Sequence, residues 1–378
     1  MRIALVHDWL TGMRGGERVL EALCELYPEA DLFTLIHAKN SVSPKIEDRR
    51  IVESFIARLP GVRRFYRYFL PIFPFAVERF DLREYDLVIS SSHCVAKGVI
   101  PGPDACHISY IHTPMRYVWD MFDEYFGIKR AGILTCLIMR PIADWLRKWD
   151  AASSYRVNFF IANSKHVQMR IDKFYKRTSS VIYPPVNISR FSLSETIEDF
   201  DLVVSALTPY KRIDLAVEAA KITGRRLLVV GTGPLAKELQ SIAWRNTEFL
   251  GWLPDSEVAK LMARCRLFIF PGVEDFGIAP LEAQAAGRPV VAFKQGGALE
   301  TVEGSDVGQT PDRSRSTGVF FFKQTPESLA EAIQFAESSI EYFDPQVLRA
   351  NAARFDISVF KQSMTNHVNE ALERHQYK

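Results

Sequence analysis

Two glutamates, Glu274 and Glu282, stand where a predicted strand is joined to a predicted helix. The strand is the apolar run 267–270, which is followed by a proline, and the helix ends before Gly287 and Pro289. In parallel α/β sheets, ligands bind beyond the carboxyl ends of the strands. We therefore expect both carboxylates to face a ligand, with the free N–H groups of the helix start turned toward an anion.

Two adjacent cations, Lys211 and Arg212, follow the predicted strand 202–206 and open another helix. Fixed positive charge stabilises the negative charge that a leaving nucleoside diphosphate gains when its bond to a sugar breaks. Lysine acts there as a point charge, and arginine can bind phosphate oxygens as a fork. A solvated helix face would carry the same residues, so the pair alone leaves both interpretations open.

Glycine-rich turns follow three predicted strands. Gly231 and Gly233 follow one strand, Gly297 follows another, and Gly15 and Gly16 lie in the loop after the first strand of the chain. Glycine lets the backbone approach a phosphate or a base closely. A tight turn between a strand and a helix explains a single Gly-x-Gly equally well.

His112 directly follows the predicted strand 108–111 and stands shortly before Arg116 and Tyr117. A lone histidine is more often a structural residue than a ligand-binding one. Its place at the carboxyl edge of a strand favours a functional interpretation.

Taken together, these segments resemble family 4 glycosyltransferases, which are retaining enzymes of the GT-B fold with a Glu-x7-Glu signature. The resemblance implies that Glu274 contacts the donor sugar and that Glu282 holds the ribose hydroxyls. It implies that His112 touches the donor sugar and that the donor lies along a set of further residues: Gly15, Gly16, Gly231, Gly233, Asp275, Phe276, Gly277, Ile278 and Gly297.

The same resemblance assigns the cations and the acceptor side. Lys211 and Arg212 would lie on the phosphates, Arg116 would meet the acceptor or a phosphate, and Tyr117 would meet the acceptor. The family commonly has an arginine where this chain has Ala206, and we expect Arg212 to take over that role.

Strands and helices alternate along nearly the whole chain, which is the pattern of an α/β protein with parallel sheets. The pattern restarts after the turn-prone segment 183–187. We predict two Rossmann-like domains that face each other across a cleft, one of residues 1–187 and one of residues 188–355. A terminal helix, 356–378, has one apolar stripe, and the resemblance implies that it crosses back to the first domain.

Composition excludes several classes of function. The net charge of +2 over 378 residues gives no reason to expect nucleic acid as a partner. Five scattered cysteines suit reduced thiols in a cytoplasm better than disulfides or a zinc site, and the start of the chain does not have the pattern of a signal peptide. The Asp-x-Asp pair 199–201 precedes its strand, so we expect a solvated loop and catalysis without a metal or another cofactor.

The motif 209–212 and the segment 112–117 most resemble those of mannosyltransferases that assemble bacterial surface polysaccharides. The predicted reaction therefore moves mannose from GDP-mannose to a lipid-linked saccharide. An epimerase on the same fold, a hydrolase that uses Glu274 and Glu282 as acid and base, and an inactive nucleotide-binding module remain the alternatives. A hydrolase would leave the phosphate-type loops unexplained.

Two segments, 58–75 and 145–149, mix basic and aromatic residues densely. Such surfaces can bind anionic lipid headgroups and place rings in the interface, which would put the enzyme on the inner face of the plasma membrane. Helices that pack their aromatic rings into the core of the first domain would have the same sequence pattern, so that alternative stays open.

Overall fold

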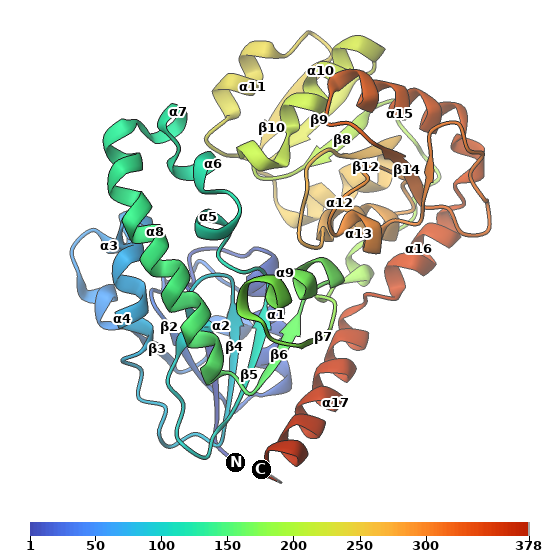
Figure 1. Ribbon diagram of the computed structural model, residues 1–378. Helices are drawn as coiled ribbons and strands as arrows, with labels where there is room; N and C mark the ends of the chain where they lie inside the picture. The colour runs from blue at the N-terminus through green and yellow to red at the C-terminus, as the bar shows by residue number, and fades with distance from the viewer. Residues whose placement is uncertain (377–378) are drawn as a thin grey trace. The chain divides into compact units, whose positions relative to one another are not determined.

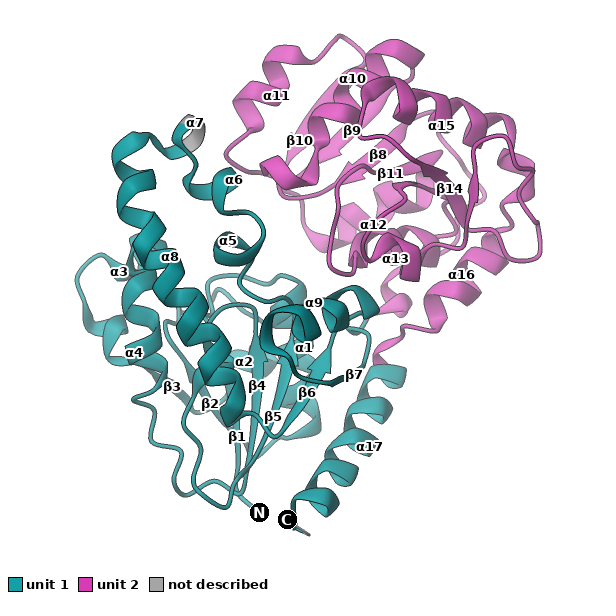
Figure 2. Ribbon diagram, in the orientation of Figure 1, with its two compact units in different colours: residues 1–185, 358–378 teal, residues 186–357 magenta. Residues whose placement is uncertain are grey.

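The computed structural model describes residues 1–376, apart from the side chains of residues 129 and 130, and they form two compact units (Figures 1 and 2). Unit 1 contains residues 1–185 together with the chain from residue 358 onward, and unit 2 contains residues 186–357. The sequence predicted the divisions at 187/188 and 355/356. Residues 377 and 378 of the predicted terminal helix lie outside the described residues.

Unit 1 contains a parallel sheet of seven strands in the order β3-β2-β1-β4-β5-β6-β7. Only β3 was absent from the predicted strands, because its three half-buried residues give no apolar run. The strands are β1 Ile3–His7, β2 Asp31–Thr34, β3 Ile51–Glu53, β4 Leu87–Ser92, β5 Cys106–Ile111, β6 Phe159–Ala162 and β7 Ser179–Val181.

Helices connect these strands, and the last helix of the chain packs on the same unit (Figure 2). The α-helices of unit 1 are α1 Gly15–Leu26, α2 Pro44–Glu47, α3 Val62–Phe65, α4 Phe73–Val77, α5 Arg116–Trp119, α6 Phe122–Phe126, α7 Ile128–Ala131, α8 Ile133–Ser153, α9 Lys165–Tyr175 and α17 Ile357–Gln376. Its 3₁₀ helices are η1 Phe55–Arg58, η2 Tyr66–Ile72, η3 Ala96–Gly98 and η4 Ser154–Arg156.

The predicted return of α17 to the first domain is confirmed. Phe360, Met364 and Val368 are buried at helical spacing along it. The Phe360 ring lies edge-on to Tyr110 of β5, with 5.9 Å between the ring centroids, and Lys361 forms an ion pair with Glu25 of α1.

Unit 2 contains a second parallel sheet of seven strands in the order β10-β9-β8-β11-β12-β14-β13. The sequence predicts strands at 227–230, 267–270 and 290–293, which are the bounds of β9, β11 and β12, and it predicts no strand at β13 or β14. The strands are β8 Asp201–Val204, β9 Leu227–Val230, β10 Thr247–Gly251, β11 Leu267–Phe270, β12 Val290–Phe293, β13 Gly304–Asp306 and β14 Gly318–Phe321.

The α-helices of unit 2 are α10 Ile213–Thr223, α11 Ala236–Ile242, α12 Asp255–Arg264, α13 Ile278–Ala285, α14 Ala298–Thr301, α15 Pro326–Ser338 and α16 Pro345–Ala353. The 3₁₀ helices are η5 Ile188–Arg190, η6 Pro209–Lys211 and η7 Ile340–Tyr342.

The sheet of unit 2 is covered on both faces, as β11 shows. Leu267 and Ile269 belong to one buried cluster, and the alternate residues Phe268 and Phe270 belong to another. A parallel strand buried on both faces reads as a continuous apolar run, which explains why this strand could be predicted to the residue. Among the described residues, no helix combines the length and the apolar character needed to cross a bilayer.

Candidate active site

In unit 2, a lysine and a glutamate that follow two neighbouring strands form an ion pair. Lys211 is the last residue of η6, which follows β8, and Glu274 lies in the loop between β11 and α13. Because β8 and β11 pair in the sheet, their carboxyl ends adjoin. The Lys211 Nζ forms an ion pair with Glu274 Oε1, and the two side chains are only 15% and 19% exposed. The structure thus brings together two of the predicted site residues.

Glu282 lies on α13, and its Oε1 is 3.7 Å from Nη1 of Arg190. The other arm of Arg190 reaches Asp255 on α12, with 2.9 Å between Nη2 and Oδ2. The sequence analysis did not single out Arg190. Its only signal was an arginine immediately beyond the turn-prone segment 183–187, which gives no hint of a carboxylate partner.

Arg212 adopts the left-handed conformation, with φ of 51°, at the residue that precedes α10. Its guanidinium donates to both carboxylate oxygens of Asp214 at 2.9–3.1 Å. The Arg212 side chain therefore binds Asp214 in the first turn of α10. Ala206, whose position it was expected to replace, is exposed. The role proposed for Arg212 on the phosphates stays a prediction.

The glycines after β9 are explained by close contact between two loops. A Cβ on Gly231, whose φ is 133°, would lie 1.9 Å from the carbonyl oxygen of Ser205. A Cβ on Gly233 would lie 2.3 Å from that of Leu207. No side chain fits at such distances, so the packing of the turn is sufficient to require glycine at both positions.

The loop that carries Glu274 is held by the loop after β12. The Gly297 N–H donates to the Glu274 carbonyl at 2.8 Å, and a Cβ on Gly297 would meet the Phe276 backbone at 2.3 Å. The Phe276 ring is buried and lies 5.7 Å, between centroids, from Phe355. Thus the Phe276 side chain serves the core. Three neighbours complete the segment: Asp275 is buried, Gly277 has φ of 90°, and the half-buried Ile278 begins α13.

In unit 1, His112 directly follows β5 and is bound to a serine that the sequence analysis missed. The hydroxyl of Ser91 lies 2.8 Å from His112 Nε2 and 3.1 Å from His7 Nδ1. The hydroxyl has one proton, so it donates to one ring and accepts from the other. The only sequence signal was the polar run 90–92 at the end of an apolar strand.

The start of α1 lies beside these two rings. A Cβ on Gly16 would lie 3.5 Å from His7 Cε1 and 3.6 Å from His112 Nε2, which are ordinary contact distances. Gly15 is the first residue of the helix, and Glu17 accepts the Arg14 N–H at 3.1 Å. Gly16 and His112, which were each assigned to the donor, therefore lie together in unit 1.

Two imidazoles here, those of His112 and His93, have a lowered pKa, which favours their neutral form near pH 7. Burial lowers the pKa of His112 well below its usual value, and the nearby His93 and His7 lower it further. Burial also lowers the pKa of His93, although the Asp8 carboxylate opposes the shift. His112 can thus offer a substrate a hydrogen bond, not a positive charge.

The loop after β4 is locked by one carboxylate. Asp8 is fully buried and accepts four backbone N–H groups, those of residues 93–96, at 2.7–2.9 Å. A buried carboxylate is tolerated only with such compensation. Asp8 therefore fixes the chain that leaves Ser91.

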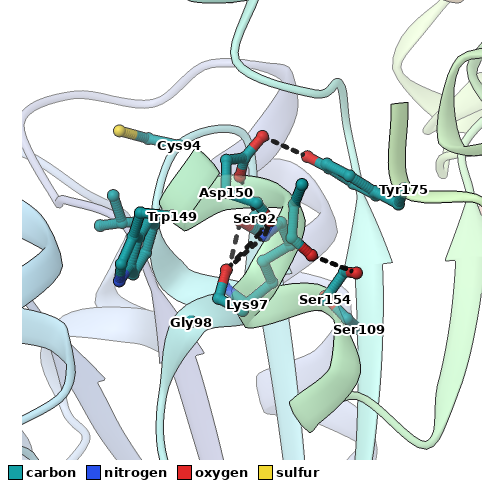
Figure 3. Close-up of polar contacts among 12 residues, drawn as sticks. Ser92, Cys94, Lys97, Gly98, Ser109, Trp149, Asp150, Ser154 and Tyr175 are labelled. Atoms are coloured by element: carbon teal, nitrogen blue, oxygen red, sulfur yellow. Dashed lines mark hydrogen bonds and ion pairs between the residues drawn. The ribbon is translucent and has the colours of Figure 1, made fainter. Parts of the chain in front are cut away.

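The next residue along, Lys97, anchors the same loop to α8 (Figure 3). Its Nζ lies 2.9 Å from Oδ1 of Asp150, and both side chains are inaccessible to solvent. The other carboxylate oxygen accepts from Trp119 Nε1 at 2.7 Å and from the Tyr175 hydroxyl at 2.9 Å. Burial lowers the pKa of Lys97 even though Asp150 raises it.

The two predicted acceptor residues begin α5, and both are half-buried. The Tyr117 hydroxyl lies 2.6 Å from Cys94 Sγ, and burial raises the pKa of this tyrosine well above its usual value. The hydroxyl of Tyr117 is therefore engaged within the unit. Contact of Arg116 and Tyr117 with an acceptor stays a prediction.

The Asp-x-Asp pair lies at the amino end of β8, as predicted, and Asp199 is in an exposed loop, but Asp201 belongs to the strand. Asp201 is only 3% exposed and binds Arg225 through both carboxylate oxygens at 2.8 and 2.9 Å. Burial raises the pKa of Asp201 to about 6. The prediction overlooked that a half-buried arginine, Arg225, can satisfy an aspartate inside a strand. Among the described side chains, no group of three His, Cys, Asp or Glu is placed to hold a metal ion.

Residues 187–352, nearly all of unit 2, match the protein family described as glycosyl transferases group 1. This part of the chain, rather than the chain as a whole, is similar to that family. The Lys211–Glu274 and Arg190–Glu282 pairs both lie within the matched range.

Three relatives align with parts of this chain. The uncharacterized glycosyltransferase MJ1178 of Methanocaldococcus jannaschii is 31% identical over 38% of this chain and 42% of its own length. A GDP-mannose-dependent monoacylated alpha-(1-6)-phosphatidylinositol monomannoside mannosyltransferase of Corynebacterium glutamicum is 36% identical over 27% of this chain and 33% of that protein. The alpha-1,3/1,6-mannosyltransferase ALG2 of Saccharomyces cerevisiae is 28% identical over 71% and 63%. The chain thus matches less than two thirds of each relative.

Solved structures share the fold over the whole chain. Anabaena HepE in complex with UDP superposes with a TM-score of 0.72 at 18% identity, covering 98% of this chain and 100% of that one. Sucrose-phosphate synthase of Thermosynechococcus elongatus gives 0.71 at 16% identity, covering 99% and 100%. The two parallel seven-stranded sheets therefore belong to the GT-B architecture, and the predicted fold class is confirmed.

Proposed function

We propose that this glycosyltransferase moves mannose from GDP-mannose to a hydroxyl of a lipid-linked saccharide during polysaccharide biosynthesis, with retention of configuration. The printed names of two relatives, a GDP-mannose-dependent mannosyltransferase acting on a phosphatidylinositol mannoside and ALG2, support mannose as the sugar. All three sequence relatives are named as glycosyltransferases or mannosyltransferases, which favours transfer over epimerisation or hydrolysis.

The observation that carries the proposal is the Lys211–Glu274 ion pair at the adjoining ends of β8 and β11. In the proposed reaction the bond between C1 of the sugar and the phosphate oxygen breaks, and the oxygen leaves with the electron pair. Lys211 stabilises the charge that develops on the diphosphate. The acceptor oxygen bonds to C1 on the same face, and its proton passes to the departing phosphate oxygen.

The other site residues receive roles that match their partners. Glu282, held by Arg190, is assigned to the ribose hydroxyls, since a carboxylate accepts two hydrogen bonds from a diol. Glu274 is assigned to the sugar hydroxyls. His112 is assigned a neutral hydrogen bond to the sugar, and Arg116 and Tyr117 are assigned to the acceptor.

We propose that the reaction needs no metal ion and takes place in the cytoplasm. The commitment of Asp201 to Arg225, at the strand end opposite Lys211, supports the first point. All five cysteines are free thiols, which supports a reducing compartment. Activity that is abolished by a chelator and restored by Mg²⁺ or Mn²⁺ would contradict the metal-free reaction.

A nucleotide screen followed by a transfer assay tests the function. GDP should raise the melting temperature of the full chain more than UDP or ADP at equal concentration, because a ligand that binds only the folded state stabilises it by mass action. Labelled GDP-mannose should then give a labelled lipid-extractable product with membrane lipids as acceptor. Greater stabilisation by UDP would overturn the donor base, and transfer to water alone would overturn the reaction class.

A further inference from the structure

The first half of α8 exposes an apolar face to solvent. Leu134 and Leu137 are 73% and 61% exposed, and Ile138 and Trp145 are exposed as well. Spacings of three, four and seven residues place these side chains on one side of the helix. Exposed apolar side chains that are contiguous, rather than scattered, mark an interaction surface.

The face continues onto the neighbouring elements of unit 1. The Trp145 ring stacks on Phe75 of α4, with 5.6 Å between centroids and 18° between planes. Phe75 is itself exposed, and so are Phe65 of α3 and Tyr68 of η2. We call this surface, from Phe65 to Trp145, the aromatic face. Figure 2 shows α3, α4 and α8 together on one side of unit 1.

The aromatic face is positively charged. With residues 129 and 130 left aside, segments 54–77 and 128–148 contain seven basic residues and one acidic residue, a net charge of +6, whereas the whole chain carries +2. Two of these charges are paired: Arg63 with Glu53 and Arg147 with Asp144. Five exposed basic residues have no acidic partner among the described side chains: Arg58, Arg64, Arg67, Arg140 and Lys148.

The helix that presents this face is fixed at its other end. Asp150, in its last turn, binds Lys97 and Tyr175, as Figure 3 shows, and it also accepts a hydrogen bond from Trp119. The indole N–H of Trp149 also donates to Glu78 at 2.8 Å. The exposed half of α8 is therefore an extension of an anchored helix, which costs little conformational entropy when it binds.

We propose that the aromatic face docks unit 1 on a bilayer that contains anionic lipids. Leucine, isoleucine and tryptophan side chains would enter the boundary between headgroups and acyl chains, and the unpaired guanidinium groups would lie at lipid phosphates. A net charge of +6 opposes the meeting of two such faces, so a second copy of this chain is a poorer occupant. The inference goes beyond the proposed function, because it needs neither nucleotide nor catalysis.

Vesicle co-sedimentation of the full chain tests the docking without any donor. Phosphatidylcholine vesicles are compared with vesicles in which a third of the lipid is phosphatidylglycerol. The wild type should pellet with the anionic vesicles at least tenfold more strongly. Arg64→Ala with Arg67→Ala should weaken this binding about 30-fold, because each basic residue near an anionic surface contributes roughly a factor of five. Leu134→Ser with Leu137→Ser should weaken it at least tenfold.

Matched variants of unit 2 provide the control. Lys221→Ala with Lys237→Ala removes two exposed charges, and Ile222→Ser with Ile242→Ser removes two exposed apolar side chains. Both should leave vesicle binding within twofold of the wild type. The proposal is overturned if these controls weaken binding as much as the unit 1 variants. It is also overturned if neutral and anionic vesicles bind equally, or if sedimentation velocity shows a dimer that Leu134→Ser with Leu137→Ser dissociates. Nucleotide-dependent melting shifts, measured in parallel, test the proposed function separately.

Discussion

The carboxyl edges of the two sheets carry different chemistry. In unit 2 the edge residues are charged and paired, Lys211 with Glu274 and Arg190 with Glu282. In unit 1 they are imidazoles bound to a serine, and all eight histidines of the chain lie in unit 1. Lysine, arginine and glutamate keep their charges near neutral pH, whereas histidine titrates there. The comparison suggests that unit 2 supplies fixed charge and that unit 1 supplies neutral hydrogen-bonding groups.

Acid should therefore unfold unit 1 before unit 2. Burial lowers the pKa of His107 to about 4, while its imidazole bonds to Ser90 and to the Arg156 carbonyl. Between pH 6.5 and pH 4 the unfolded chain binds the proton more strongly than the folded chain does. The free energy of unfolding therefore decreases as the pH is lowered. The loss from His107 alone is about 3 kcal/mol.

Hydrogen exchange, corrected for the intrinsic rates, measures this difference on the full chain. Protection of β4 and β5 should fall from pH 6.5 to pH 4.5, and that of β9 and β11 should not. His107→Gln should flatten the dependence in unit 1. An equal loss of protection in both sheets would contradict the proposed difference in acid stability between the two units.

Removal of the fixed charge should abolish most of the turnover. Lys211→Ala is expected to lower kcat by roughly 100-fold, equivalent to about 2.7 kcal/mol, because a preorganised charge opposite the leaving group is lost. The defect should be the same at pH 6 and pH 8. Lys221→Ala, an exposed lysine on α10, is the matched control and should keep wild-type turnover. A loss of less than threefold for Lys211→Ala would remove Lys211 from the phosphates.

The second pair of unit 2 should act on affinity. Glu282→Ala is expected to weaken GDP binding about tenfold, as the loss of hydrogen bonds to a carboxylate would do. Asp255→Ala removes the other partner of Arg190 and should leave the affinity unchanged. Calorimetric titration of both variants compares the two. If Glu282→Ala and the wild type bind GDP with equal affinity, Glu282 does not bind the ribose.

The smallest effect is expected from the serine that orients His112. Ser91→Ala should lower kcat by a few-fold, because it removes one hydrogen bond that fixes the imidazole. Ser91→Thr keeps the hydroxyl and should restore the rate, and Ser90→Ala, on the same strand, should not reproduce the loss. A pH–rate profile under saturating donor would also show whether His112 remains neutral. Wild-type turnover for Ser91→Ala would make its contact purely structural.

The sequence predicted elements that are buried and apolar, and it missed polar or short ones. The strands β9, β11 and β12 are continuous apolar runs, so their bounds could be predicted, but β3 and β13 have three residues each and no such pattern. β14 is fully buried, yet it was not among the predicted strands either.

The site follows the same rule. Motif residues such as Glu274 and Lys211 could be named from local order, because each follows an apolar strand. Partners that come from distant segments, such as Arg190 for Glu282 and Ser91 for His112, depend on how the sheets assemble. Asp201 shows the converse error, since a polar residue was assigned to solvent although Arg225 satisfies it inside the unit.

The most direct test of the central claim is a crystal structure of the chain with GDP bound. The account predicts diphosphate oxygens within ion-pair distance of Lys211 Nζ and ribose hydroxyls within hydrogen-bond distance of the Glu282 carboxylate. A nucleotide bound elsewhere, with Lys211 still paired with Glu274 and Glu282 still beside Arg190, would contradict this prediction.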